Sequence, residues 1–569
     1  MKRILIANRG EIAVRIARAC LDQGYTSLAV YADQDVDAMH VRLADEAYGL
    51  RGQTAAETYL SIEKIIGVAK RAKADAIHPG YGFLAENADF ARAVEEAGMT
   101  FIGPTAETIE KLGDKVTARE IAREVGAPLV PGSEGPLSGP EEAVSWAEEN
   151  GLPVVLKASY GGGGRGMKIV HQIEDVAAAY QAGSYEAQMA FGRGEMFIEK
   201  FLDRPRHIEV QILGDGTGNV LVVGDRDCSL QRRNQKLVEE APAPNLPDPI
   251  RENIHRAAHD ICAAVNYRSA GTVEFLLGRD GTVSFLEVNT RLQVEHPVTE
   301  KTSGIDLVRA QFAIAEGEGL PATTMPEPVG HAIEFRVNAE DPGRGFLPSP
   351  GHISRIRQPG GLGVRWDNGV QAGDDIPAEF DSIAAKLIVS ASSRGEALAR
   401  ARRAIKETSI DGVATTLPFM RAVVQHPDFA GEIPAVDTGW IERELIPVLE
   451  AQPRAKLRRR VDFHRVPIEI DGQIRTIGLP DGVAMLGTPG AAAAQAPAED
   501  PTELKSPITG TMFRLLAAEG TRVEAGETVA IGETMKMETN IIAHITGTIH
   551  WLVEAGGPLE AGKPVARIS

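Results

Sequence analysis

The chain has 569 residues, and its 60 Lys and Arg residues against 79 Asp and Glu residues give a formal net charge of −19. This acidic balance argues against a nucleic-acid-binding protein, because binding to the phosphate backbone depends on clustered basic side chains. The three cysteines are widely spaced and form neither a disulfide framework nor a CxxC zinc motif, which indicates a reducing compartment. No apolar run reaches the length of a membrane span, so we expect a cytoplasmic protein. At ~100–200 residues per domain, the length predicts several domains.

The first part of the chain alternates strand-like apolar runs with amphipathic helical stretches. The runs are RILIA, SLAVYA, AIHPG and TFIG, and this βαβ rhythm predicts a parallel sheet. The turn from Asn8 to Glu11 has one glycine where a dinucleotide fingerprint needs three. The sequence therefore predicts a nucleotide-type α/β fold that does not bind NAD.

A glycine-rich loop lies between two predicted strands in LPVVLKASYGGGGRGMKIV. The loop leads into a strand and lacks GK[ST], so neither a Rossmann nor a Walker motif fits. Gly161 to Gly166 could close on a polyphosphate through backbone N–H groups that no Cβ obstructs, with Lys157 adding a positive charge. A plain hinge is the alternative interpretation of this glycine run.

The sequence GTVEFLLGRDGTVSFLEVNTR predicts a hairpin that carries a metal site. Asp280-Gly281 is typical of a two-residue turn, and that turn places Glu274 directly opposite Glu287. Opposed carboxylates destabilise a strand pair unless something compensates them, and a hard divalent cation with oxygen ligands does so. Asn289 lies on the same face two residues later, so a Mg²⁺ or Mn²⁺ site is predicted here.

A cation, an amide and a carboxylate follow the hairpin within five residues, at Arg291, Gln293 and Glu295. Arg291 and Gln293 are suited to hold a small planar anion, with Glu295 as a general base. We interpret His296 as a structural residue.

Residues 448–500 are predicted to form a linker that contains one small hairpin. VPIEI and QIRTI flank an Asp-Gly pair, which predicts the hairpin. The basic run from Arg454 to Arg460 is interpreted as a solvated face, and TPGAAAAQAPAEDP has the composition of a flexible linker.

The segment 501–569 contains an internal repeat, because Ile508 to Thr511 recurs as Ile545 to Thr548. Two similar all-β halves are expected to pack face to face, with their join, ETMKME, at one exposed turn. The turn would present Lys536 to solvent between two methionines. This position suits covalent attachment of a carrier group.

These motifs resemble two known families. Met535-Lys536-Met537 resembles the mark of biotinyl carrier domains, whereas lipoyl domains have different neighbours around their lysine. A second set of motifs resembles biotin carboxylase, an ATP-grasp enzyme, over about residues 1–447: IANRGEIA, HPGYGFLAEN, GDKVTAR, VLKAS, PRHIEVQ, RDCSLQRR, KLVEEAPAP, FLEVNTRLQVEHPVTE, and HAIEFRVNAED followed by FLPSPG. The whole chain resembles the α-chain of a biotin-dependent acyl-CoA carboxylase of the acetyl- or propionyl-CoA type.

The resemblance implies an α/β biotin carboxylase with an ATP-grasp fold, followed by a linker and a small all-β biotinyl domain. The implied units are an N-terminal carboxylase domain (1–115), an ATP-grasp domain (116–330) with a lid at about 130–202, a carboxylase C-terminal domain (331–447), the linker (448–500) and the carrier domain (501–569).

The resemblance also implies the role of each matching residue. ATP is contacted by Lys115, Lys157, His207 and Gln231, by the flap residues Gly163, Gly164 and Met167, and on the adenine side by Glu199, Lys200 and Leu202. The metal is held by Glu274, Glu287 and Asn289. Bicarbonate is bound by Lys236, Arg291, Gln293 and Val294, with Glu295 as the base. Arg336 stabilises the biotin enolate, and Lys536 carries the biotin. Where the family commonly has histidine this chain has Asn234, so no role is carried over to it.

The implied function is ATP- and bicarbonate-dependent carboxylation of biotin on Lys536. The carboxyl group then passes to a carboxyltransferase β-subunit in a hetero-oligomer, for transfer to an acetyl-, propionyl- or longer acyl-CoA in fatty-acid or related metabolism. A biotin protein ligase is the implied modifying partner. The alternatives are a methylcrotonyl-CoA carboxylase α-chain, a carboxylate–amine ligase, which has no use for the lysine turn, and a nucleotide sensor that binds ATP without cleaving it.

Overall fold

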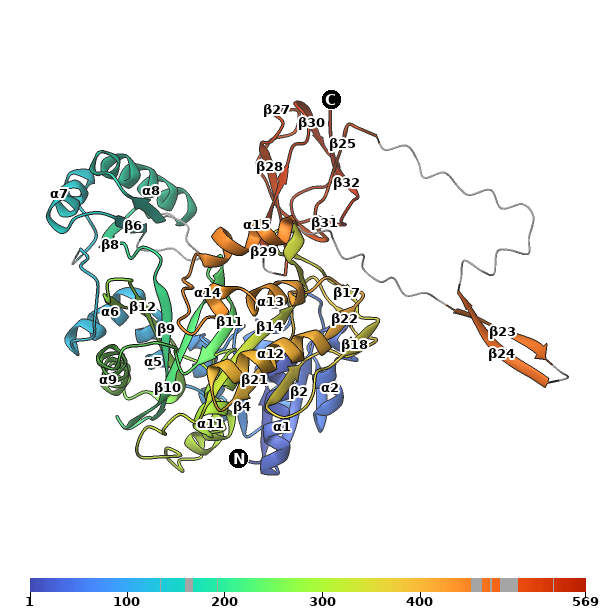
Figure 1. Cartoon of the computed structure of the whole chain (residues 1–569), viewed down its shortest axis with the longest axis horizontal. Helices are drawn as coiled ribbons and strands as arrows, with labels where there is room; N and C mark the ends of the chain where they lie inside the picture. The colour runs from blue at the N-terminus through green and yellow to red at the C-terminus, as the bar shows by residue number, and fades with distance from the viewer. Residues whose placement is uncertain are drawn as a thin grey trace.

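The computed structural model describes residues 1–133, 135–158, 167–191, 193–451, 463–470, 473–480, 500–535 and 537–569. The predicted glycine flap, the basic run from Arg454 to Arg460, Lys536 and residues 488–499 lie outside these ranges. Within them, no helix combines the length and the apolar character that crossing a bilayer requires. Figure 1 shows the chain from its blue N-terminal sheet to its red C-terminal all-β domain.

The N-terminal segment forms a parallel five-stranded sheet in the order β3-β2-β1-β4-β5. All four apolar runs are strands, as predicted, and buried aliphatic side chains pack on both faces of the sheet. The elements are β1 (Arg3–Ile6), α1 (Gly10–Gln23), β2 (Thr26–Tyr31), α2 (Met39–Leu43), β3 (Glu46–Gly49), α3 (Ile62–Arg71), β4 (Ala76–His78), α4 (Ala88–Glu96), β5 (Thr100–Phe101) and α5 (Ala106–Gly113).

One antiparallel sheet of eight strands runs through the middle of the molecule, in the order β13-β12-β9-β10-β11-β14-β21-β19. Its strands are β9 (Arg206–Asp215), β10 (Val220–Arg232), β11 (Gln235–Ala241), β12 (Arg268–Leu277), β13 (Val283–Asn289), β14 (His331–Asn338), β19 (Val364–Asn368) and β21 (Ile383–Ala391). The pairing of β11 with β14 continues the sheet across residue 330. The hairpin strands β12 and β13 and the strand of Arg336 therefore belong to one framework.

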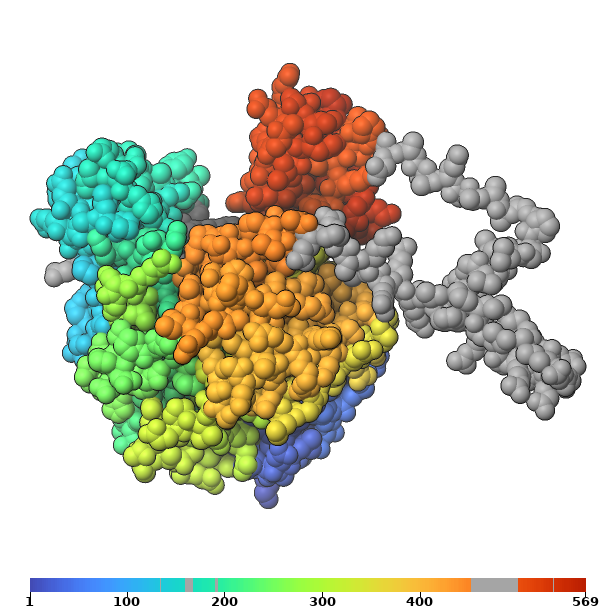
Figure 2. Space-filling view, in the orientation of Figure 1, coloured from blue at the N-terminus to red at the C-terminus, as the bar shows by residue number. Residues whose placement is uncertain are grey.

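The lid has a sheet of its own, β7-β6-β8, and a small apolar core. It consists of α7 (Pro140–Asn150), β6 (Val154–Ala158), β7 (Met167–Val170), α8 (Val176–Phe191) and β8 (Met196–Lys200). Figure 2 shows the lid and the C-terminal all-β domain as two lobes on the same side of the carboxylase body.

Helices and short strands complete the carboxylase part. The helices are α6 (Lys115–Glu124), α9 (Asp248–Ala264), α10 (His296–Ser303), α11 (Leu307–Ala315), α12 (Arg394–Glu407), α13 (Leu417–Val423), α14 (Pro427–Ala430) and α15 (Ile446–Glu450). The short strands are β15 (Glu340–Asp341), β16 (Leu347–Pro348), β17 (Gly351–His352), β18 (Arg355–Arg357), β20 (Asp375–Ile376) and β22 (Ser409–Asp411). The hairpin predicted in the linker is present as β23 (Phe463–Ile470) and β24 (Gln473–Pro480).

The β12–β13 hairpin pairs Glu274 with Glu287, as predicted, but its turn differs from the prediction. The N–H of Gly278 donates to the carbonyl of Thr282 at 2.8 Å, so three residues rather than two form the turn between them. The extra residue is Gly281, at φ +84°. This left-handed conformation after a tight turn is one that glycine adopts without a steric penalty.

A bulge in β13 restores the predicted register. The partners of Glu274 and Phe275 are Glu287 and Phe285, so Leu286 is one residue more than the ladder needs. The longer turn shifts the pairing by one position and the bulge shifts it back. The prediction of the turn was wrong, yet the predicted carboxylate pair is present because the two deviations cancel.

The C-terminal domain is all-β and has the predicted repeat, but its halves interleave. One sheet has the order β25-β32-β30-β27 and the other β29-β28-β26-β31, so each takes two strands from each half. The strands are β25 (Glu503–Lys505), β26 (Gly510–Leu515), β27 (Arg522–Val523), β28 (Thr528–Thr534), β29 (Met537–Ile542), β30 (Gly547–Trp551), β31 (Pro558–Leu559) and β32 (Pro564–Ile568). The expectation of two separate halves was therefore wrong.

The join between the repeats lies against the carboxylase part, whereas the sequence predicted an exposed turn. Met535 is only 4% exposed and belongs to the apolar cluster of the carboxylase C-terminal segment. Its N–H donates to the carbonyl of Ala378 at 2.8 Å. The prediction of exposure was wrong for Met535 because a protein surface covers it.

We expect Gly281→Ala to lower the free energy of unfolding by about 1–2 kcal/mol, since a Cβ at this left-handed position is strained although it meets no atom within 4 Å. Gly395→Ala, in helix α12, is the matched control and should raise stability by about 0.5–1 kcal/mol. Denaturant midpoints of the two variants should therefore move in opposite directions. Equal midpoints would contradict the three-residue turn.

Candidate active site

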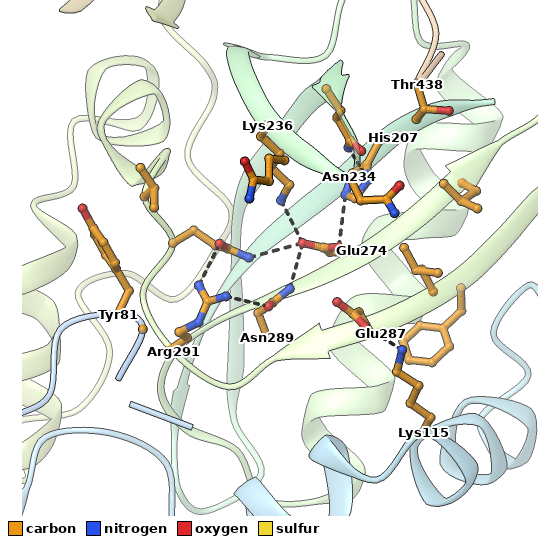
Figure 3. Close-up of a pocket in the computed structure, with 18 of the residues that line it drawn as sticks. Tyr81, Lys115, His207, Asn234, Lys236, Glu274, Glu287, Asn289, Arg291 and Thr438 are labelled. Atoms are coloured by element: carbon orange, nitrogen blue, oxygen red, sulfur yellow. Dashed lines mark hydrogen bonds and ion pairs between the residues drawn. The ribbon is translucent and has the colours of Figure 1, made fainter. Parts of the chain in front are cut away.

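A cavity of about 920 Å³ lies between the lid, the long sheet and the N- and C-terminal carboxylase segments. Side chains from all of these elements line it, together with Met535 and Met537 of the all-β domain. Nearly every described residue to which the sequence assigned a role lies in or beside this one space. Figure 3 shows part of its lining.

The floor of the cavity is built by strand alternation on β9, β12 and β13. Glu209 of β9 pairs with Glu274 of β12, which in turn pairs with Glu287 of β13. His207 lies two residues before Glu209, and Asn289 lies two residues after Glu287, so both point to the same face as the carboxylates. The His207 ring lies 3.2 Å from Glu274, and the Asn289 amide donates to Glu274 at 2.8 Å.

Lys236 of β11 is the cation that balances this floor. Its ammonium contacts three buried carboxylates, Glu209, Glu274 and Glu295, the last two at 2.8 Å. Burial disfavours the charged ammonium, but the three carboxylates outweigh burial and hold the pKa of Lys236 well above its usual value. The lysine therefore stays charged at any physiological pH.

Glu295 lies fully buried between two cations. One oxygen accepts from Lys236 and the other from Arg336 at 2.9 Å. Burial raises the pKa of this carboxyl, but Lys236 and Arg336 more than offset burial and hold it well below its usual range. Glu295 is thus ionised, which is the state that a proton acceptor needs.

Arg291 and Gln293 lie side by side at the end of the hairpin. A guanidinium nitrogen of Arg291 donates to the Gln293 side-chain oxygen at 2.9 Å, and another donates to Asn289 at 3.0 Å. Glu86 of the N-terminal segment holds the remaining edge of Arg291 at 2.8 Å. The carbonyl of Val294 accepts from Lys386 at 2.8 Å, which ties this loop to β21.

Glu274 and Glu287 differ in how their charge is compensated. Burial raises the pKa of Glu274, yet Lys236 and His207 hold it well below its usual range. Burial and then the charge of Glu274 raise the pKa of Glu287, whose own cation, Lys115, is 3.8 Å away. Glu287 therefore has a carboxylate that a divalent cation could neutralise.

A second group of side chains that could bind a metal lies on the same floor of the cavity. It consists of His207, Glu209 and Glu274. Its ligand atoms lie within 4.8 Å of one another. The Lys236 ammonium already neutralises two of these carboxylates. We favour Glu274, Glu287 and Asn289 as the place for a metal, because this set includes Glu287, whose carboxylate lies 3.8 Å from its cation, Lys115.

The lid side of the cavity has its own charge cluster. Glu199 of β8 binds Lys157 at 2.6 Å and Arg119 of α6 at 2.9 Å. Lys200 and Leu202 line the same wall, with the Lys200 ammonium donating to the carbonyl of Leu152 at 3.0 Å. Met167 and Gln231 also line the cavity, whereas Gly163 and Gly164 lie outside the described residues.

Several charged residues of the site were missed by the sequence analysis. Glu209 had a visible signal, because HIEVQ alternates polar and apolar residues and its polar face joins that of Glu274. Glu239, which binds Arg336 at 2.6 Å, and Lys386 depend on the order β11-β14-β21, which no local pattern reveals. Arg119 ends the quoted motif GDKVTAR on helix α6, but only Lys115 of that motif was given a role.

The fold and the site define an ATP-grasp enzyme, and comparisons with known proteins agree. Family models match residues 1–109 (biotin carboxylase, N-terminal domain), 114–323 (carbamoyl-phosphate synthase L chain, ATP binding domain), 334–443 (biotin carboxylase C-terminal domain) and 502–568 (biotin-requiring enzyme). The biotin carboxylase of Campylobacter jejuni in complex with β,γ-ATP has a TM-score of 0.73 and 43% identity, covering 78% of this chain and 99% of that one.

Two further relatives give the particular type. The biotin carboxylase domain of the Hydrogenobacter thermophilus 2-oxoglutarate carboxylase, solved with MgADP, ADP and bicarbonate, has a TM-score of 0.73 and 44% identity, covering 80% of this chain and 99% of that one. The biotin-dependent acyl-coenzyme A carboxylase alpha3 subunit of Mycobacterium leprae is 50% identical over 100% of this chain and 98% of its own length. The chain belongs to the α subunits of biotin-dependent acyl-CoA carboxylases. It is a biotin carboxylase, a ligase component whose biotin belongs on the biotinyl domain.

We expect Glu287→Gln to have opposite effects with and without a metal. Without Mg²⁺ the variant should melt slightly above the parent, because it removes one of two opposed charges. Its affinity for Mn²⁺ in the presence of ADP should fall at least about tenfold, since a charged oxygen ligand is lost. Glu174→Gln, at an exposed position in the lid, is the control for both measurements. Unchanged Mn²⁺ affinity would exclude Glu287 from the metal site.

Proposed function

We propose that the single cavity is where ATP, bicarbonate and the carrier's biotin meet, each against its own group of side chains. The observation that carries this proposal is the continuity of the lining. Lid residues, the Glu274–Glu287 pair, the residues Arg291, Gln293 and Val294, Arg336 and the two carrier methionines border one space. ATP, bicarbonate and biotin differ in chemistry, and their reaction requires one space that all three can enter. Glu199, Lys200 and Leu202 would contact the adenine side, and Lys115, Lys157, His207 and Gln231 the phosphates.

The oxygen ligands of the hairpin fit a hard cation. Glu274, Glu287 and Asn289 offer two carboxylates and an amide oxygen on neighbouring strands, and Glu287 is incompletely compensated. A bound Mg²⁺ would supply charge neutralisation at the phosphate oxygens of ATP.

Arg291, Gln293 and Lys236 would hold bicarbonate next to Glu295. The ionised Glu295 accepts the bicarbonate proton while a bicarbonate oxygen attacks the γ-phosphorus of ATP. The bond between that phosphorus and the β,γ-bridging oxygen breaks, and ADP leaves. The mixed anhydride formed in this step hydrolyses readily in water, so closure of the lid over the cavity serves to exclude solvent.

Decomposition of the anhydride gives CO₂ and phosphate, and the phosphate removes the proton from the acceptor nitrogen. The biotin supplies this ureido nitrogen, which takes up CO₂. Arg336, held at 2.6 Å by Glu239 and at 2.9 Å by Glu295, is positioned to stabilise negative charge that develops in this part of the cavity.

The biotin would be attached at Lys536 by a biotin protein ligase, and its carboxyl group would be delivered to a carboxyltransferase β-subunit. The relative from M. leprae is named as an alpha subunit, which implies other subunits. The acceptor would be an acetyl-, propionyl- or longer acyl-CoA bound by that other chain, within a hetero-oligomer that serves fatty-acid or related metabolism.

Glu295→Ala should reduce bicarbonate-dependent cleavage of ATP by about a hundredfold or more, because it removes the proton acceptor and also takes one carboxylate partner from each of Lys236 and Arg336. The measurement is ADP release with free biotin as the acceptor. Glu174→Ala, at the exposed lid position used above, is the control in this assay. A near-parental rate for Glu295→Ala would rule out the assigned base.

Lys536→Arg should abolish modification of the chain. After co-expression with a biotin ligase, intact-protein mass spectrometry should show one added biotin on the parent and on Lys563→Arg, but none on Lys536→Arg. Biotin found on any other residue would disprove the attachment site, whatever the activity of the carboxylase part.

A further inference from the structure

The carrier domain contacts the carboxylase part at two places that the reaction chemistry does not use. One is the backbone hydrogen bond from Met535 to Ala378, beside the buried Met535 side chain. The other is Leu347 of β16, which packs against the apolar core of the carrier domain. Figures 1 and 2 show the carrier domain seated on the C-terminal segment of the carboxylase.

Ala378 and Leu347 each lie close in the chain to a fully buried phenylalanine. Ala378 lies two residues before Phe380, which is fully buried in the core of the N-terminal domain. The Phe380 ring meets the edge of Tyr59 at 5.4 Å and lies 4.3 Å from the guanidinium of Arg9. The carbonyl of Ala378 is therefore held by a rigid segment.

Leu347 directly follows Phe346, which is also fully buried. Phe346 packs edge-on against Phe419 at 5.5 Å, and the Arg232 guanidinium lies 4.9 Å above its ring. Leu347 itself is only half-buried, so its side chain reaches the carrier. Phe346 and Leu347 are the first two residues of FLPSPG, a motif to which the sequence analysis assigned no function.

Hydrogen bonds join the two segments to each other and to the cavity. The Ser382 hydroxyl donates to Glu340 at 2.5 Å, and the N–H of Ala339 donates to the carbonyl of Ser382 at 2.8 Å. Glu340 and Ser382 line the cavity, as do Met535 and Met537. Movement of either contact would therefore change the place where the carrier turn enters the cavity.

We propose that Ala378 and Leu347 form a docking surface for the biotinyl domain of this chain, anchored by Phe380 and Phe346, which sets how the carrier turn enters the carboxylase cavity. This inference rests on the proposed function of the cavity. The occupant of the surface is residues 501–569, which already contact it. Leu347 and Ala378 are positioning residues, since neither is among the described residues that line the cavity.

The test compares the tethered and the free substrate in Leu347→Ser. Incorporation of labelled bicarbonate into the full-length biotinylated chain, measured in a single turnover with ATP, should slow about fivefold, because an apolar contact is lost. The same chain prepared without biotin and supplied with free biotin should turn over at the parental rate. Leu362→Ser, at a leucine that is 85% exposed, is the matched control and should change neither rate.

A parental tethered rate in Leu347→Ser overturns the docking surface, and so does an equal fall in both rates. Amide hydrogen exchange gives an independent readout: the peptide that contains Met535 should be protected in the parent and exchange faster in Leu347→Ser. Equal exchange in both overturns the inference. Absence of label from the parent chain contradicts the proposed function instead, and amide exchange then still decides whether the surface docks the carrier.

Discussion

The carboxylase site depends on the ion pairs that the Lys236 ammonium forms with three carboxylates. The carboxylates come from β9, β12 and the segment before α10, and all of them are buried. Taking these charges out of water costs several kcal/mol each unless a counter-charge is present, and removing one partner of such a pair leaves an uncompensated charge. With Lys236 in place, Glu274 and Glu295 both stay ionised, one as a proposed metal ligand and the other as the proposed base.

Glu287 is the carboxylate of this group that Lys236 does not neutralise. It belongs to the floor by strand pairing, but within the described residues it forms an ion pair only with Lys115 of α6, at 3.8 Å. The protein thus neutralises the inner carboxylates with its own side chains and leaves the outer one for a ligand. A fully balanced floor would bind a divalent cation weakly, because no net negative charge would remain to attract it.

Local sequence patterns predicted that Glu274 and Glu287 pair, but they did not predict the turn and the bulge that produce this pairing. Alternation along β12 and β13 and the Asp-Gly pair were enough to place Glu274 opposite Glu287, although the real hairpin has a longer turn and a bulge. Glu274 and Glu295 lie 38 and 59 residues away from Lys236 in the chain, yet both accept hydrogen bonds from its ammonium. Such convergence is set by sheet order and not by spacing, so only family resemblance could assign Lys236 and Arg336, and Lys386 escaped notice.

The carrier domain shows the same limit at the level of topology. Its repeat predicted two equivalent halves, and equivalent pairings do exist, since Gly510 pairs with Leu559 and Gly547 pairs with Val523. These pairings join one half to the other and build mixed sheets. A repeat shows that two segments resemble each other, but it does not show which strands pair. It also gives no information about the surface of another domain that covers the repeat.

A carrier that serves two active sites must bind each of them weakly. One backbone hydrogen bond contributes about 0.5–1.5 kcal/mol, and burial of one methionine adds roughly 1.5–3 kcal/mol before the entropic cost of docking. Such a contact would scarcely hold two separate proteins together. Within one chain the effective concentration of the carrier is of order millimolar, so a weak contact suffices to fill the cavity. Under the proposed function, the same weak contact lets the carrier leave for a carboxyltransferase.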